Sequence, residues 1–235
     1  FEFLIAWRYL RARRAEGGVS VMTWISLVGI ALGVMALVAT LAVRAGFRAE
    51  FVDTILGANA HVTVYRGSYV DEQGVTTRGM ADFAEVRDRV AAVPGVTRAA
   101  PVVRGQAMVT LNDRSNVAEV YGISLGDLKT IPRVAGSSEA LGDIERFGEG
   151  IAVGSGIARD LGLMVGDKVK LISPSGAKTA FGVSPRVNAY EVVYIFSAGR
   201  WDIDRTRIYM PFTEAQSYFN REGAADEIEI YVADP

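Results

Sequence analysis

The most prominent pattern in the chain is an uninterrupted apolar run, VMTWISLVGIALGVMALVATLAV, at residues 21–43. About 23 uncharged residues at 1.5 Å each form a helix of roughly 34 Å, enough to cross a hydrocarbon core of about 30 Å. The preceding FEFLIAWRYLRARR is typical of an amphipathic interfacial helix, and the following RAGFRAEFVDTILG keeps helical spacing as a stalk. We therefore expect an interfacial helix over 1–16 and a membrane helix with its stalk over 17–57.

The charges beside this run predict its orientation. Arginines cluster before it, at positions 8, 11, 13 and 14, so the N-terminus is expected to stay cytoplasmic and the residues after about 44 to lie across the membrane. The run is too long for a cleaved signal peptide, which has an apolar region of about 7–15 residues. A simple one-helix anchor remains an alternative.

One face of the predicted membrane helix carries small residues. They recur at spacings of three and four, and they are Ser26, Gly29, Gly33, Ala36 and Thr40. Small side chains at this spacing let another helix approach closely, whereas an anchor that faces only lipid has no use for such a face. The pattern indicates packing against partner helices.

From about residue 58 the hydrophobic period changes to that of a mixed α+β domain with short strands and few helices. Strands are predicted at 61–65, 95–103, 105–111, 116–123, 191–199, 206–212 and 227–232, and helices at 80–93 and 213–220. Residues 150–173 read as strand, short helix, Gly-Asp turn and strand. The predicted fold class is thus a membrane-anchored α+β protein, with a domain at 58–235.

Between two of these strands, SPSGAKTAFGVSPRVNAYEV (173–192) reads as a long insertion. It is longer than a hairpin turn of about two to five residues requires, and long loops are commonly functional or disordered. From chain physics alone it is an exposed arm, and an ordinary loop is the competing interpretation.

Composition excludes several kinds of site. The 235 residues carry a net charge of −2, no cysteine and one histidine, His61, which argues against nucleic-acid binding, thiolate chemistry and a multi-histidine metal centre. Gly154-Ser155-Gly156 lacks nucleophile-elbow spacing and better suits a helix cap, and Asp202 and Asp204 suit a locally neutralised turn better than an acid–base pair. We expect no catalytic site, no metal site and no cofactor bound by this chain.

In combination, these segments resemble a known family. The membrane helix with its preceding amphipathic segment, GIARDLGLMVGDKVKLISPSG (156–176), and RIYMPFTEAQSYFN (207–220) with EIEIYVADP are similar to the lipoprotein-releasing permeases of the bacterial Lol transporter. The resemblance covers essentially the whole chain. It implies a MacB-like periplasmic core domain with a protruding hairpin loop at about 173–190.

The resemblance also implies partners and a location. Two such permeases pair with a separate ATPase dimer, which binds ATP and Mg, in the bacterial inner membrane. The assembly passes lipoprotein cargo to a soluble periplasmic carrier. Family members have four membrane helices, so this chain is expected to be an N-terminal part that lacks three of them. The resemblance leaves open whether the partner permease is identical or paralogous.

Two sets of site residues follow from the resemblance. A hook loop that docks the carrier carries Thr-x-x-Gly and then Pro-Arg, which match the segment with Thr179, Phe181, Gly182, Pro185 and Arg186. The last four of these residues are expected to form the docking tip. Acyl chains of the cargo are expected to contact Leu37, Leu41 and Phe47. Two alternatives stay open: an exporter-type or division-associated permease, and a single-pass anchored binding or sensor protein.

Overall fold

A computed structural model of the chain describes residues 1–11, 17–56, 59–67, 69–70, 76–77, 79–174, 176, 178–179 and 182–233. It contains two compact units, Phe1–Val52 and Asp53–Pro235.

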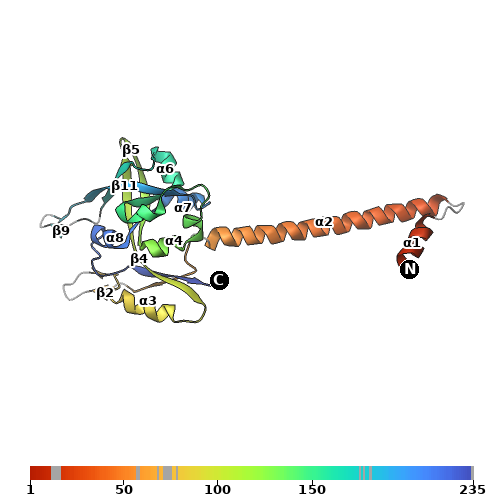
Figure 1. The fold of residues 1–235 in the computed structure, drawn as a ribbon, viewed down its shortest axis with the longest axis horizontal. Coiled ribbons are helices and arrows are strands. Elements are labelled where there is room, and N and C mark those ends of the chain that lie inside the picture. Colours follow the sequence, from red (N-terminus) through yellow and green to blue (C-terminus); the bar gives the residue numbers. More distant parts are fainter. Residues whose placement is uncertain are drawn as a thin grey trace. The chain divides into compact units, whose positions relative to one another are not determined.

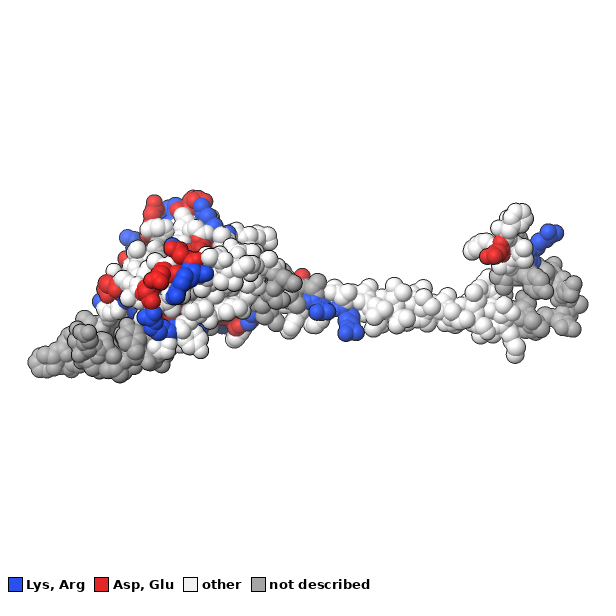
Figure 2. All heavy atoms as spheres, turned by 90° about the horizontal axis from the view of Figure 1, so that it is seen from below, with Lys and Arg blue, Asp and Glu red and all other residues white. Residues whose placement is uncertain are grey.

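The first unit is helical, and its long helix is apolar. Helix α1 spans Glu2–Arg11 and α2 spans Gly17–Leu56. The stretch Val21–Arg48 has a mean hydropathy of 2.4 and is the one described segment long and apolar enough to cross a membrane. Figure 2 shows most of this stretch as white surface, with blue basic side chains toward its C-terminal end. The sequence prediction of a single continuous helix through membrane run and stalk agrees with α2.

The second unit is built on a mixed sheet, with short helices against it (Figure 1). Its main strands are β1 (Val62–Tyr65), β4 (Val96–Leu111), β5 (Arg114–Ile123), β6 (Leu141–Gly142), β7 (Ile151–Gly154), β8 (Lys168–Ser173), β11 (Arg186–Phe196), β12 (Arg207–Pro211) and β13 (Glu227–Val232). Its helices are α3 (Phe83–Ala91), α4 (Leu125–Lys129), α5 (Pro132–Ala135), the 3₁₀ helix η1 (Ile144–Glu149), α6 (Ser155–Leu161), α7 (Trp201–Thr206) and α8 (Phe212–Tyr218). Two small hairpins are β2 (Tyr69–Val70) with β3 (Thr76–Thr77), and β9 (Lys178–Thr179) with β10 (Gly182–Val183).

Six of the strands close into a barrel. The pairs run β4–β5–β12–β7–β11–β8, and β8 then pairs back to β4 through Val109↔Leu171. Because side chains alternate across a strand, every second residue faces the interior. The interior is fully buried and apolar, with Val103, Val109, Val120, Val153, Leu171, Val192 and Ile208, and α6 and α8 contribute to the same core.

Two further clusters lie outside the barrel interior. One contains Tyr121, Tyr209 and Phe196 and packs against α4, α5, η1 and α7. The other places α3 on β13 around Ile228. The mixture of parallel pairs, such as β5–β12, with antiparallel pairs confirms the predicted α+β class.

Three sequence predictions of local structure are wrong. The two strands predicted at 95–103 and 105–111 are the single strand β4, because Gly105 lies in the strand where the ring of Phe219 fills the place of a side chain. The turn predicted at Asp202 and Asp204 is helix α7. The long insertion ends sooner than predicted, since β11 already begins at Arg186.

Candidate functional site

The predicted arm is a β-hairpin that extends two barrel strands. β8 and β11 pair antiparallel from Lys168↔Glu191 to Ser173↔Arg186, and β9 and β10 continue outward with Thr179 opposite Gly182. We call residues 174–185 the projecting hairpin. In Figure 1, β9 points away from the domain on the side opposite the end of β13, and β13 lies beside β1. The hairpin therefore projects away from the side where the domain's first and last strands meet.

The root of the hairpin requires a glycine at position 176. Gly176 is buried, and a Cβ there would lie 2.7 Å from the backbone nitrogen of Arg186 and in direct collision with the carbonyl oxygen of Ser184. Only glycine allows two backbones to approach so closely. The two sides of the hairpin are thus in contact before β9 and β10 begin.

The structure places Arg186 at the root of the hairpin and not at its tip. Arg186 is the first residue of β11, and its guanidinium donates one hydrogen bond to the carbonyl oxygen of Ser217 and another, of 2.9 Å, to Oδ1 of Asn220. Both acceptors lie at the C-terminal end of α8. Pro185 beside it is exposed. Contact of these two residues with a partner stays a prediction.

The other predicted hook residues are described less fully. Thr179 and Gly182 form the outermost described backbone pair of the hairpin. Phe181 lies outside the described residues.

The residues predicted on the membrane helix lie on α2 as expected. At 100° per residue, Ser26, Gly29, Gly33, Ala36 and Thr40 fall within an arc of about 80°. The hydroxyl of Thr40 donates to the carbonyl oxygen of Ala36 over 2.8 Å, and a Cβ on either glycine would meet no atom within 4 Å. The face is thus smooth and open within this chain, and its use for helix packing stays a prediction.

The predicted acyl-chain residues are exposed on the same helix. Leu37, Leu41 and Phe47 are 59%, 53% and 69% exposed, and the ring of Phe47 stacks on that of Phe51 with centroids 5.7 Å apart. Their role in contacting acyl chains also stays a prediction.

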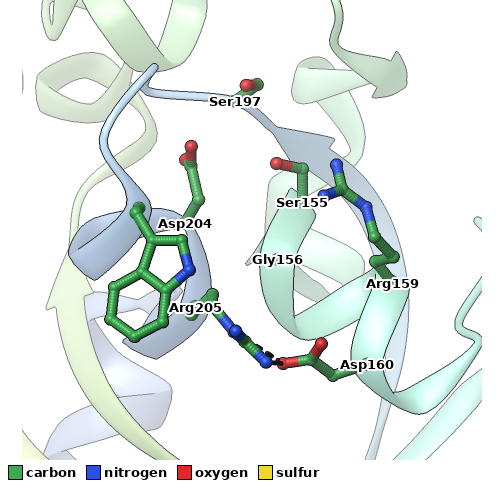
Figure 3. A pocket seen from close by; sticks show the side chains of 8 residues that line it. Ser155, Gly156, Arg159, Asp160, Ser197, Asp204 and Arg205 are labelled. Carbon is green, nitrogen blue, oxygen red and sulfur yellow. Dashed lines mark hydrogen bonds and ion pairs between the residues drawn. The ribbon is translucent and has the colours of Figure 1, made fainter.

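A pocket of about 260 Å³ lies between α6 and α7 (Figure 3). Within it, the guanidinium of Arg205 binds the carboxylate of Asp160 over 2.6 Å and lies 5.0 Å from the ring centre of Trp201. Ser155 follows the N-cap Gly154 of α6, which confirms the helix-start interpretation of Gly-Ser-Gly. The pocket walls are mostly polar, and two of their charged groups, Arg205 and Asp160, pair with each other.

Asp202 and Asp204 differ in their surroundings. The Arg200 side chain binds Asp202 over 2.6 Å and lowers the pKa of that carboxyl. Burial raises the pKa of Asp204, whose Oδ1 accepts a 2.6 Å hydrogen bond from the backbone N–H of Ala198. Asp204 therefore holds the loop before α7.

The single histidine has a structural position. Nδ1 of His61 accepts a 3.1 Å hydrogen bond from the backbone N–H of Val232, and its ring lies 5.2 Å from that of Tyr231. In the part of the chain that the structure describes, no group of three or more His, Asp or Glu side chains could hold a metal ion.

Sequence reasoning missed a buried charge cluster beside the start of the domain. Arg207 and Glu229 are each only 9% exposed, and Arg98 lies 3.7 Å from Glu229. The Arg207 guanidinium lies 4.4 Å from the ring centre of Tyr121 and donates to Oδ1 of Asn59 over 3.1 Å. The alternation of charged and apolar residues at 207–209 and 227–231 indicates one polar face of the sheet. The pattern does not show whether that face is exposed to solvent or buried.

Comparison with known proteins gives a consistent family. The family of MacB-like periplasmic core domains matches residues 23–235. The lipoprotein-releasing system transmembrane protein LolC of Neisseria meningitidis is 31% identical over 241 residues, which cover 100% of this chain and 55% of that protein. LolE of Haemophilus influenzae is 26% identical over 99% of this chain and 55% of its own length.

These relatives are longer than the chain. It spans about half the length of the curated relatives it matches. Among solved structures, the periplasmic region of MacB from Actinobacillus actinomycetemcomitans aligns with a TM-score of 0.47 and 11% identity over 78% of both chains.

Proposed function

Because the chain belongs to the family of MacB-like periplasmic core domains, and within it to the LolC/LolE type of permease, we propose that it is the membrane-anchored periplasmic part of a lipoprotein-releasing ABC transporter. Helix α2 crosses the bacterial inner membrane with the N-terminus cytoplasmic. The barrel domain stands in the periplasm. ATP and Mg are bound by a separate ATPase dimer, and a second permease, identical or paralogous, completes the assembly.

The projecting hairpin is the proposed docking element for a soluble periplasmic lipoprotein carrier. The single observation that carries this proposal is its construction: a hairpin rooted in two barrel strands and pointing away from the side where the first and last strands of the domain meet. An element built on a rigid scaffold loses less conformational entropy when it binds than a free loop does. Phe181 supplies an apolar anchor in this proposal, and Pro185 stiffens the strand beside it.

The proposed transport step is mechanical. Acyl chains of the cargo lie between the first membrane helices of the two permeases and contact Leu37, Leu41 and Phe47. Closure of the ATPase dimer narrows that space and drives the cargo toward the carrier held by the hairpin. In this proposal the open small-residue face of α2 packs against a helix of the partner permease.

Deletion of residues 178–183 in the full-length permease, assembled with its partner subunits, tests the docking role. We expect loss of carrier capture in a pull-down and loss of lipoprotein release from proteoliposomes, while ATPase assembly is retained. The matched control replaces Asn112–Asp113, the turn of the β4–β5 hairpin on the same barrel, by Gly-Gly, and should leave both activities intact.

Carrier capture that survives the deletion would reject the hairpin as the docking element. If capture and lipoprotein release are both absent from the unaltered assembly, while another substrate class is exported, the exporter-type alternative replaces the proposal. A full-length protein with no further membrane helix would favour the anchored sensor.

A further inference from the structure

The C-terminal end of α8 carries an asparagine at a position where most helices have a glycine. The backbone N–H of Arg221 bonds to the carbonyl oxygen of Gln216 over 2.7 Å, and that of Asn220 points to the carbonyl oxygen of Ser217 over 3.4 Å. This pair of bonds is the Schellman motif that ends many helices. Asn220 occupies its left-handed position with φ of 54°, where glycine is the usual residue because it carries no Cβ.

The amide of Asn220 makes contacts that a glycine lacks. Its Nδ2 donates to the carbonyl oxygen of Gly176 over 3.2 Å, and its Oδ1 accepts from the Arg186 guanidinium over 2.9 Å. One side chain therefore bridges both sides of the hairpin root, since Gly176 precedes β9 and Arg186 begins β11. The second arginine bond, to the carbonyl oxygen of Ser217, ties the same root to α8.

Helix α8 is itself a fixed platform. Ala215 is fully buried in the barrel core, and Tyr218 and Phe219 pack in the same core. Near its N-terminal end, Glu214 accepts a 2.7 Å hydrogen bond from the hydroxyl of Tyr190, which lies on β11. The helix is thus attached to β11 at both ends, and what Asn220 holds is held relative to the barrel.

We propose that Asn220 is a positioning residue that, together with Arg186, fixes the direction in which the hairpin leaves the barrel. This inference rests on the proposed docking function of the hairpin. It assigns Arg186 to the support of the hairpin and places the contact with the carrier on the residues beyond it. The left-handed position, where glycine is usual, is occupied by asparagine, which tolerates that backbone conformation and also carries a hydrogen-bond donor and an acceptor.

Asn220→Gly separates this role from folding, because glycine suits the helix end and removes only the amide. Asn112→Gly is the matched control: Asn112 and Asn220 are the non-glycine residues with positive φ among those described, and Asn112 has φ of 52° in the β4–β5 turn. Asn220→Asp keeps the acceptor for Arg186 and loses the donor to Gly176, so it should give an intermediate effect.

The first measurement is amide hydrogen exchange over residues 176–186 in the full-length permease complex in nanodiscs, without carrier. For Asn220→Gly we expect about tenfold faster exchange there and an unchanged Tm, since two side-chain hydrogen bonds are lost. The second measurement is carrier affinity, expected to fall about fivefold for Asn220→Gly and not for Asn112→Gly.

The two measurements distinguish the positioning role of Asn220 from the docking function of the hairpin. Exchange equal to that of Asn112→Gly overturns the positioning role, whatever the carrier does. Faster exchange with carrier affinity unchanged, in an assembly where deletion of 178–183 abolishes capture, also overturns it. Faster exchange in an assembly where that deletion leaves capture intact retains the support of the hairpin but rejects the docking function.

Discussion

Replacement of Arg207 by methionine is a demanding test of what stabilises the second unit. Arg207 and Glu229 are almost fully buried, and the Arg207 side chain also reaches Asn59, the first described residue of the second unit after α2. Methionine fills a similar volume but leaves Glu229 with Arg98 as its nearest cation, 3.7 Å away.

The expected cost is large because a buried charge loses a partner. Arg207 stabilises the charged form of the buried Glu229 carboxylate electrostatically. Leaving a buried charge without such an opposite charge costs about 3–5 kcal/mol, and the remaining Arg98 favours the lower end, about 3 kcal/mol. In a domain of this size 1 kcal/mol shifts Tm by roughly 2–4 °C, so we expect a fall of about 6–12 °C at pH 8. Arg104→Met is the control: Arg104 is half exposed, and its loss should cost less than about 1 kcal/mol.

The cost should depend on pH, with a sign fixed by Glu229. Burial already raises the pKa of Glu229 above the ordinary 4.5, and Arg207 opposes that rise. Loss of Arg207 raises this pKa further, so the folded state binds the proton more tightly than the unfolded state does. The destabilisation is therefore full above the raised pKa and is relieved as pH falls through it toward 4.5.

Thermal unfolding of the full chain in detergent, followed by near-ultraviolet circular dichroism between pH 5 and 8, measures both effects. Glu229→Leu combined with Arg207→Met should recover most of the loss, because it removes the buried carboxylate, while Arg98 keeps Asp127 as a partner 3.6 Å away. A cost for Arg207→Met below 1 kcal/mol, or one that is the same at pH 5 and pH 8, would refute the reasoning.

Three further outcomes follow from the structure. Gly105→Val should lower the free energy of unfolding by about 1–3 kcal/mol, because an aromatic ring fills its site, whereas Gly148→Ala, with open space around it, should not; chemical denaturation compares them. Gly33→Leu should reduce co-purification of the proposed partner permease about tenfold, while Gly46→Leu, about 140° around α2 from Gly33 and outside the small-residue face, leaves it unchanged, and equal losses would contradict a packing face. Asp204→Ala should cost about 1–3 kcal/mol by freeing buried backbone donors and leave transport per folded molecule unaltered, which rules against a catalytic carboxylate.

The sequence predicts well what depends on local pattern. The uncharged run gives α2, alternation gives β1 and β13, and the family resemblance gives the projecting hairpin. It fails where a distant residue decides: β4 runs straight through Gly105 because Phe219, far along the chain, covers that glycine.

The closure of the barrel and the contacts at the hairpin root could not be predicted from the sequence for the same reason. Closure depends on β8 pairing with β4, about sixty residues earlier, and no local pattern records that register. From the sequence Arg186 is predicted as an exposed tip residue, because its acceptors, Ser217 and Asn220, lie about thirty residues later, at the C-terminal end of α8.

The neighbouring first and last strands also decide how the domain bears force. Val62 of β1 pairs with Ile230 of β13, so the beginning of one strand and the end of the other lie side by side. Tension that draws these two points apart opens the antiparallel ladder one hydrogen bond at a time, as a zipper opens, instead of shearing all its bonds together. The barrel, joined to this pair through β4, lies outside that load path.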